Sequence, residues 1–274
     1  MDVPMNAPWR VTAAPRTGAE GHAAAAEIAV RLGLQQIRRG NRSLGSMTRA
    51  HGPGGWLIVH PRHGLHGMTP DGTPWRWHPG LARTRVSARA AGHPDPLLQA
   101  LGLPRDAPLR LLDVNLGQGH DAMVASDGGA DVVGLEIDAV VHAITTDGLA
   151  RCDHPVLQAC ARRIQTRCGD QATELAALPN DSFDAVLFSP MYLAPEFHAE
   201  DLVQLRQVAQ QGWPSDETFA EALRVAPLVV VKVEPGRHPE LPHVTRWLGG
   251  RRRVAWAIMT RPTVPPPDAD SASE

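Results

Sequence analysis

The stretch LLDVNLGQGHDA, residues 111–122, decides the fold. Two leucines lead to Asp113, then Gly117 and Gly119 form a glycine turn, and helix-forming residues follow. A glycine turn lets the backbone approach a ligand closely, and the helix behind it offers free N–H groups and the positive end of its dipole. The pattern predicts a nucleotide-like ligand at the carboxyl end of a strand.

The sequence around this stretch alternates between apolar runs and helical patterns, which predicts an α/β fold with a mostly parallel sheet and helices on both faces. The expected strands are Leu109–Val114, Asp131–Leu135, Arg163–Arg167, Phe183–Phe188, Leu228–Val233 and Val254–Met259. The expected helices are a short one up to Ser126, Ala139–Leu149, Phe197–Ala209 and Asp216–Val225. This unit is expected to span residues 106–262.

The remaining parts of the chain look different. Residues 1–20 are rich in proline, alanine and glycine and predict a loosely held arm. Residues 21–105 predict a helix at Gly21–Leu32, ended by Gly33, and a small β and helical subdomain. Its expected strands are Trp56–Val59, Leu65–Met68 and Trp75–Trp77. The tail at 263–274 is polar and proline-rich and predicts disorder.

Composition narrows the class of protein. The chain has 274 residues and a net charge of −2, and it contains no apolar run of the roughly 18 residues that a membrane span needs. No secretory signal is evident, and Cys152, Cys160 and Cys168 match no disulfide or metal framework. We therefore expect a protein of the reducing cytoplasm, with no metal and no membrane partner.

Two groups of side chains leave alternatives open. His60, His63 and His66 recur every third residue, a spacing that favours hairpin histidines over a zinc site. Arginines cluster at 38–42 and at 251–253, where they could hold phosphates or form solvated charge runs. The near-neutral net charge argues against a broad basic surface.

Two acidic positions extend the glycine loop into a cofactor site. Glu136 closes the second strand, 23 residues after Asp113, where a carboxylate can accept hydrogen bonds from both hydroxyls of a ribose. Gly169 and Asp170 end the third strand, where a carboxylate can meet an adenine amino group. A carboxylate at the tip of the first strand favours S-adenosylmethionine over a dinucleotide. Dinucleotide binding, a structural turn and a degenerate site remain as alternatives.

The segment Ser189-Pro190-Met191-Tyr192 follows the strand Phe183–Phe188. Enzymes that methylate exocyclic amines of bases place a polar-Pro-x-aromatic segment here: carbonyl acceptors hold the amine and the aromatic ring stacks on the base. A plain turn with a half-buried aromatic is the alternative. Tyr192 is the only tyrosine of the chain, and Lys232 is its only lysine. An arginine would differ from Lys232 in geometry, so we expect a catalytic role for Lys232 beside Ser189, Pro190, Met191 and Tyr192. A lysine that merely extends to solvent is the alternative.

Three segments resemble the small-subunit ribosomal RNA (guanine-N2) methyltransferases of the RsmJ group, over about residues 80–260. They are DVNLGQGHDAMVAS (113–126), VVHAITTDGLAR (140–151) with Glu136 before it, and SPMY (189–192) paired with VVVK (229–232). The resemblance implies a class I, Rossmann-like fold with a seven-stranded sheet and S-adenosylmethionine as cofactor.

By the same resemblance, six residues would contact the cofactor: His120, Asp121, Glu136, Ile137, Gly169 and Asp170. Ser189 would contact the cofactor and also belong to the catalytic segment 189–192. The implied acceptor is a guanine amine in structured ribosomal RNA. The chain departs from the family at Ser189, where the family has aspartate, and at His120, where it has arginine. These departures leave open a small metabolite or peptide acceptor, or a non-catalytic relative.

Overall fold

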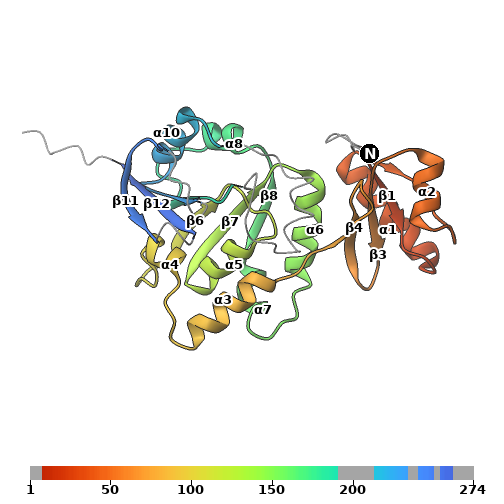
Figure 1. The fold of residues 1–274 in the computed structure, drawn as a ribbon, viewed down its shortest axis with the longest axis horizontal. Helices are drawn as coiled ribbons and strands as arrows, with labels where there is room; N and C mark the ends of the chain where they lie inside the picture. The colour runs from red at the N-terminus through yellow and green to blue at the C-terminus, as the bar shows by residue number, and fades with distance from the viewer. Residues whose placement is uncertain (1–7, 191–212, 234–239, 250–253, 262–274) are drawn as a thin grey trace, which may run out of the picture.

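The chain forms two β-sheets that lie side by side along its longest axis (Figure 1). This computed structural model describes residues 8–190, 213–233, 240–249 and 254–261. Within these ranges a five-stranded sheet occupies the N-terminal part of the chain, and a seven-stranded sheet occupies the rest. The second sheet carries the glycine loop.

The seven-stranded sheet has the order β11-β12-β10-β9-β6-β7-β8. Its strands are β6 (Leu109–Asp113), β7 (Ala130–Glu136), β8 (Gln165–Cys168), β9 (Ala185–Phe188), β10 (Leu228–Val233), β11 (Val244–Leu248) and β12 (Ala255–Thr260). Strands β6, β7, β8, β9 and β10 run parallel to one another, whereas β12 is antiparallel to both of its neighbours, β10 and β11. The predicted Rossmann-like sheet is confirmed; the sequence had not predicted β11.

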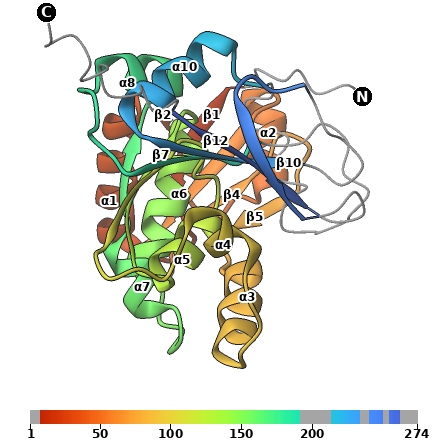
Figure 2. The same cartoon turned by 90° about the vertical axis from the view of Figure 1, so that its left-hand side faces the viewer.

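Helices cover both faces of this sheet (Figure 2). They are α3 (Gly80–Ala90), α4 (Pro96–Leu101), α5 (His120–Asp127), α6 (Ala139–Ala150), α7 (Gln158–Arg163), α8 (Gln171–Ala177) and α10 (Asp216–Val225). Leu111 belongs to the core under α3, α4, α5 and α7, and its neighbour Leu112 to the core under α8 and α10. Because both faces are covered, the strands read as nearly continuous apolar runs. The helix predicted at 197–209 lies outside the described residues.

The N-terminal sheet has the order β2-β1-β3-β4-β5. Its elements are β1 (Trp9–Ala13), α1 (Gly18–Leu32), β2 (Gln35–Gln36), α2 (Leu44–His51), β3 (Gly55–His60), β4 (Gly64–Met68) and β5 (Pro74–Arg76). Strands β3, β4 and β5 form the predicted antiparallel element, and α1 ends at Gly33 as predicted.

The expectation of a loose arm over residues 1–20 is wrong for its described part. Strand β1 lies inside the sheet, parallel to both β2 and β3. Val11 is fully buried, and Thr12 and Ala13 are buried beside it. The few apolar residues of WRVTA alternate towards one core, a signal that the surrounding prolines and alanines obscured. Residues 1–7 lie outside the described part. The predicted tail at 263–274 also lies outside it, together with residue 262.

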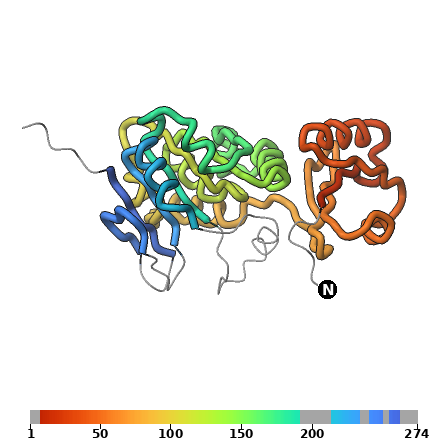
Figure 3. Tube along the Cα trace, turned by 90° about the horizontal axis from the view of Figure 1, so that it is seen from above, coloured from red at the N-terminus to blue at the C-terminus, as the bar shows by residue number. Residues whose placement is uncertain are grey.

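Helix α6 lies between the two sheets (Figures 1 and 3). Its residues Val140, Val141 and Ile144 share a core with Trp75 of the N-terminal sheet, and its Leu149 belongs to the core of the larger sheet. A helix that is apolar around most of its surface is buried on several sides. The two sheets are therefore joined by a shared helix as well as by the chain.

Packing also moves the predicted boundary at residues 105 and 106. Helices α3 and α4 lie before it, yet Val86, Leu97 and Leu101 pack into the core of the larger sheet. The apolar faces of these helices can be buried only against that sheet, because the N-terminal sheet is covered by α1, α2 and α6. The larger unit therefore begins near residue 78.

Candidate functional site at the carboxyl edge of the sheet

The polar residues that the sequence singled out gather at one edge of the larger sheet. Asp113 ends β6, Glu136 ends β7, and Gly169 follows β8 directly. Ser189 follows β9 in the same way. The strand order reverses at β6, which lies between β7 and β9, and ligands of open α/β sheets bind at such a switch point beyond the carboxyl ends of the strands.

Asp113 presents a buried acceptor to this edge. The side chain is 1% exposed; its Oδ1 accepts a hydrogen bond from the Asn115 amide at 3.1 Å. Within the described residues its Oδ2 has no hydrogen-bond partner. Burial raises the pKa of Asp113 to about 7, and the nearby Asp121 carboxylate adds to the effect. A buried carboxylate is stabilised when its oxygens accept hydrogen bonds, above all from a cation.

The glycine loop is clamped between β7 and α6. The Gly117 amide donates to Glu136 Oε2 at 3.0 Å, and the Asp138 amide donates to Glu136 Oε1 at 3.0 Å. The carbonyl of Gly117 accepts from Thr145 Oγ1 of α6 at 2.6 Å. Gly117 and Gly119 have φ angles of 52° and 74°, which a residue with a Cβ adopts at a cost. Burial raises the pKa of Glu136, although these amides oppose the shift.

Asp121, in the first turn of α5, belongs to a buried network of charges. Its Oδ1 pairs with Arg85 at 2.5 Å and its Oδ2 with Lys232 Nζ at 2.7 Å. Arg85 also holds Asp95 with two bonds of 2.8 Å. Against the opposing effect of burial, Lys232 and Arg85 lower the pKa of Asp121 below its usual range. The direct cofactor contact that the resemblance implied for Asp121 stays a prediction beside this internal role.

Lys232 is therefore held in place by two groups. Besides its ion pair with Asp121, its ammonium lies 5.7 Å from the centre of the Trp256 ring on the neighbouring strand. The side chain remains 25% exposed. The lysine thus joins β10 to the start of α5, and the sequence had predicted a catalytic role for it without this partner.

The segment after β5 reaches the glycine loop from the N-terminal side. Trp77 Nε1 donates to the carbonyl of Gln118 at 2.9 Å, and His120 Nε2 lies 2.7 Å from the carbonyl of His78. The loop is therefore tied to the connection between the two sheets. His120 is nine-tenths buried, and its ring is engaged by the His78 carbonyl.

The remaining predicted cofactor residues surround the same edge. Asp170 caps α8, its Oδ1 accepting from the amide and the hydroxyl of Thr173 at 2.9 and 3.0 Å. The Gly169 amide donates to the carbonyl of Glu136 at 3.0 Å, which joins β8 to the end of β7. Ile137 is 38% exposed, so an apolar side chain is accessible next to Glu136.

The second predicted segment is described only at its start. Ser189 Oγ lies 3.5 Å from the carbonyl of Asn115, so the end of β9 touches the glycine loop, and Pro190 is buried. Met191 and Tyr192 lie outside the described residues.

Sequence reasoning missed three residues of this site: Arg85, Asn115 and Trp77. Asn115 lies inside the quoted stretch, and its Oδ1 is a second buried oxygen without a hydrogen-bond partner in the described part of the chain. Its polarity two residues after Asp113 was a usable signal. Arg85 and Trp77 are far away in sequence, and no local pattern marks them.

Other candidate sites are weaker. Among the described residues, no group of three or more histidine, cysteine, aspartate or glutamate side chains is placed to hold a metal. None of the helices in the described ranges combines the length and apolar character that crossing a bilayer requires.

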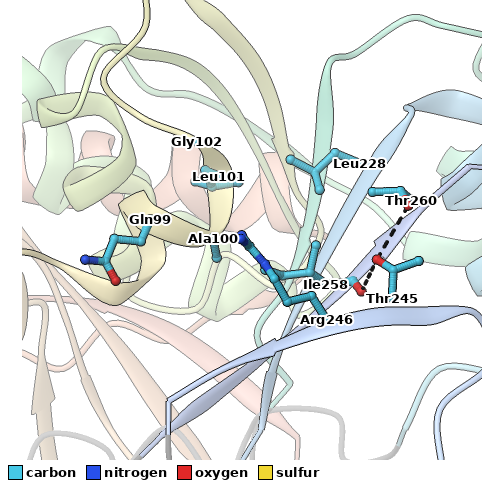
Figure 4. A pocket seen from close by; sticks show the side chains of 9 residues that line it. All are labelled: Gln99, Ala100, Leu101, Gly102, Leu228, Thr245, Arg246, Ile258 and Thr260. Carbon is cyan, nitrogen blue, oxygen red and sulfur yellow. Dashed lines mark hydrogen bonds between the residues drawn. The ribbon is translucent and has the colours of Figure 1, made fainter.

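A cavity of about 300 Å³ lies between α4 and the pair β11–β12 (Figure 4). Leu228, the first residue of β10, lines it, which places it away from the carboxyl edge.

Comparison with known proteins agrees with this geometry. A family described as "Putative SAM-dependent methyltransferase" matches residues 78–245. The uncharacterized protein YpiP of Bacillus subtilis is 32% identical over 188 residues, which is 67% of this chain and 72% of YpiP. The ribosomal RNA small subunit methyltransferase J of Alkalilimnicola ehrlichii is 36% identical over 154 residues, 52% of this chain and 56% of that protein.

The fold is also found in a crystal structure of an S-adenosylmethionine-dependent methyltransferase from Neisseria gonorrhoeae. The two structures align with a TM-score of 0.62 at 18% identity, covering 92% of this chain and 95% of the other. The fold and site thus define a class I methyltransferase. The chain belongs to the S-adenosylmethionine-dependent methyltransferase family, its cofactor is S-adenosylmethionine, and the resemblance to the J group is confirmed.

Proposed function

We propose that this chain binds S-adenosylmethionine at the carboxyl edge of β6 and β7 and methylates the exocyclic N2 amine of a guanine in small-subunit ribosomal RNA. The first half of the proposal rests on the buried Oδ2 of Asp113, which has no hydrogen-bond partner among the residues that the structure describes. The methionine end of the cofactor offers an ammonium group, which is the donor that this carboxylate lacks.

The residues around Asp113 would hold the other parts of the cofactor. Glu136, whose oxygens already accept two amides, keeps lone pairs for the ribose hydroxyls. Ile137 offers an exposed apolar surface for the adenine, and Asp170 keeps its Oδ2 for the adenine amine. The backbone of Gly117, Gly119 and His120 would approach the methionine portion.

The acceptor would bind beside the segment 189–192. The cofactor supplies an electrophilic methyl group; the new N–CH₃ bond forms as the S–CH₃ bond breaks, and the amine gives up a proton. A guanine amine is a poor nucleophile, so positioning supplies much of the rate. We assign the orientation of the amine to carbonyl oxygens at Ser189 and Pro190. Met191 would line the acceptor and Tyr192 would stack on the base. Lys232 would set the position of α5 through Asp121.

The RNA acceptor rests on relatives that are named ribosomal RNA small subunit methyltransferase J. The chain spans 56%, 62% and 70% of three of these proteins. An acceptor in ribosomal RNA would place the activity in the cytoplasm. Ser189 in place of the family's aspartate favours a second candidate, a small metabolite or peptide acceptor on the same fold. A non-catalytic, cofactor-binding relative is the third.

Two measurements test these alternatives. Calorimetry with S-adenosylmethionine should show binding; its absence at millimolar cofactor would contradict every cofactor-dependent candidate. Mass spectrometry of nucleosides from small-subunit RNA, compared between cells with and without the gene, should show N2-methylguanosine falling when the gene is absent. Cofactor binding with unchanged N2-methylguanosine would shift the assignment to another acceptor.

A further inference from the structure

We propose that the basic face of the N-terminal sheet binds the phosphate backbone of structured RNA and thereby delivers the acceptor to the carboxyl edge. The basic face consists of the cations Arg38, Arg39, Arg42 and Arg76, together with His66. The proposal rests on the proposed function, because it names the surface by which the RNA acceptor would be held.

Charge is distributed unevenly along the chain. Residues 32–79 contain six arginines and one aspartate, Asp71. This segment carries a net charge of +5 in a chain whose total is −2, so the remaining residues together carry −7. The near-neutral total therefore hides a cationic N-terminal unit on an anionic larger unit. Concentrated positive charge on one side of a protein attracts a polyphosphate and orients its approach.

The fold collects these charges on one face of the N-terminal sheet. Ile58, His66 and Arg76 are paired across β3, β4 and β5, so their side chains leave the same face. This is the face on which α2 packs, through Met47 and Ile58, whereas α1 and α6 cover the other face. Arg76 therefore points away from the core shared with α6.

The loop that precedes α2 carries three more arginines, and the charge of Arg39 reaches His66 on this face. The guanidinium of Arg42 donates to the carbonyls of Arg38 and Arg39 at 2.6 and 3.2 Å, and Arg39 Nε donates to the carbonyl of Arg42 at 2.6 Å. These bonds fix the loop and keep the three cations together. The pKa of His66 reflects this positive charge. Burial lowers the pKa to about 4, and the nearby charges of Arg76 and Arg39 contribute to this shift.

Within the described ranges these arginines have no acidic partners. In the described part of the chain, none of the four arginines of the basic face forms an ion pair with a carboxylate, unlike Arg85, Arg89, Arg110, Arg151, Arg224 and Arg261. Arg38 and Arg76 are exposed, and their side chains form no hydrogen bond there. Like charges held together without counter-charges cost free energy, and a bound row of phosphates would remove that cost.

The basic face is also connected directly to the cofactor site. Arg76 ends β5, and the next residue, Trp77, donates its indole N–H to the carbonyl of Gln118 in the glycine loop at 2.9 Å. RNA that crosses β5 would therefore lie beside the segment that supports the loop. RNA rather than an acidic protein is favoured because guanidinium groups pair with phosphates in a bidentate manner.

The test uses the whole protein and an in vitro transcript of small-subunit ribosomal RNA in a filter-binding assay. The double variant Arg38→Gln/Arg76→Gln removes two exposed cations whose side chains make no internal bonds. We expect its Kd for the transcript to rise about tenfold at 0.1 M salt. The slope of log K against log salt should become shallower by roughly one to two units, as expected for two lost phosphate contacts. The matched control is Arg83→Gln/Arg162→Gln, two exposed arginines of the larger unit, with an unchanged Kd.

Each outcome of this assay decides the proposal. Equal Kd values for the wild-type protein and the Arg38→Gln/Arg76→Gln variant would overturn it, as would equal losses in the variant and the control. Poly-L-glutamate that competes as well as RNA would instead assign the face to an acidic protein partner. Because the assay needs no methyl transfer, a wild-type protein that binds RNA through this face without methylating it would contradict only the proposed function. Calorimetry with S-adenosylmethionine should give the same cofactor affinity for all variants.

Discussion

Lys232 Nζ lies 2.7 Å from Asp121 Oδ2, so the only lysine of the chain neutralises a carboxylate that is 7% exposed. Arg85 completes the neutralisation from α3, at 2.5 Å from the other oxygen. Three elements distant in sequence thus meet at the start of α5, directly behind the glycine loop. The network fixes the first turn of α5, which directly follows the glycine loop.

Replacing Asp121 by asparagine should lower the free energy of unfolding by about 3–5 kcal/mol, because two cations lose their shared partner in a buried site. Lys232→Met should cost less, since Asp121 keeps Arg85 and Lys232 is 25% exposed. Urea denaturation measures both, with the exposed Asp131→Asn as control. The pKa of Asp121 is lowered, so its stabilising contribution is present above the usual carboxyl pKa and is lost as the pH falls below that range.

Cofactor affinity should rise with pH up to about 7, because Asp113 must lose its proton to hold an ammonium and its pKa is raised to about 7. The affinity should change by about tenfold per pH unit below that value. Calorimetry at pH 5.5 and pH 7 measures the change, and Asp113→Asn should bind weakly at both.

The stability of the cofactor-free protein depends on pH in the opposite direction. The folded state keeps the Asp113 proton between about pH 4 and 7, so this group makes the protein less stable as the pH rises through that window. Parallel affinity profiles for the wild-type protein and Asp113→Asn would contradict this role.

Glu136→Ala should weaken cofactor binding by roughly 1–3 kcal/mol, since it removes the acceptor proposed for the ribose and releases the amides of Gly117 and Asp138. Tyr192→Ala serves as the contrast, because the proposed stacking on the base predicts lower methyl transfer at nearly unchanged cofactor affinity. Equal losses of cofactor affinity in the two variants would show that the division between cofactor side and acceptor side is misassigned.

Trp77→Phe should lower cofactor affinity by about 0.5–1.5 kcal/mol, because the ring still fills its place but no longer donates to the Gln118 carbonyl. The half-exposed Trp213 provides the control, Trp213→Phe. Calorimetry would show whether the N-terminal connection supports the glycine loop: an affinity equal to that of the control would mean that it does not.

Much of the larger sheet could be predicted, because buried parallel strands are apolar on both faces and end at recognisable turns. The positions of Asp113, Glu136 and Asp170 at strand ends followed from that periodicity alone. The partners of Asp121 could not be predicted, since Arg85 and Lys232 are separated from it by 36 and 111 residues. Strand β1 was missed because five residues between prolines and alanines carry too little pattern.

The helix between the two sheets has a consequence for how the chain can change. Helix α6 packs into two cores, with Val140 and Ile144 in that of the N-terminal sheet and Leu149 in that of the larger sheet, so a shift of the helix that suits one sheet disturbs the other. The N-terminal unit could not be exchanged for a different one, or removed, without redesigning the helix that also carries Thr145 beneath the glycine loop. The N-terminal unit and the larger unit are therefore constrained to vary together.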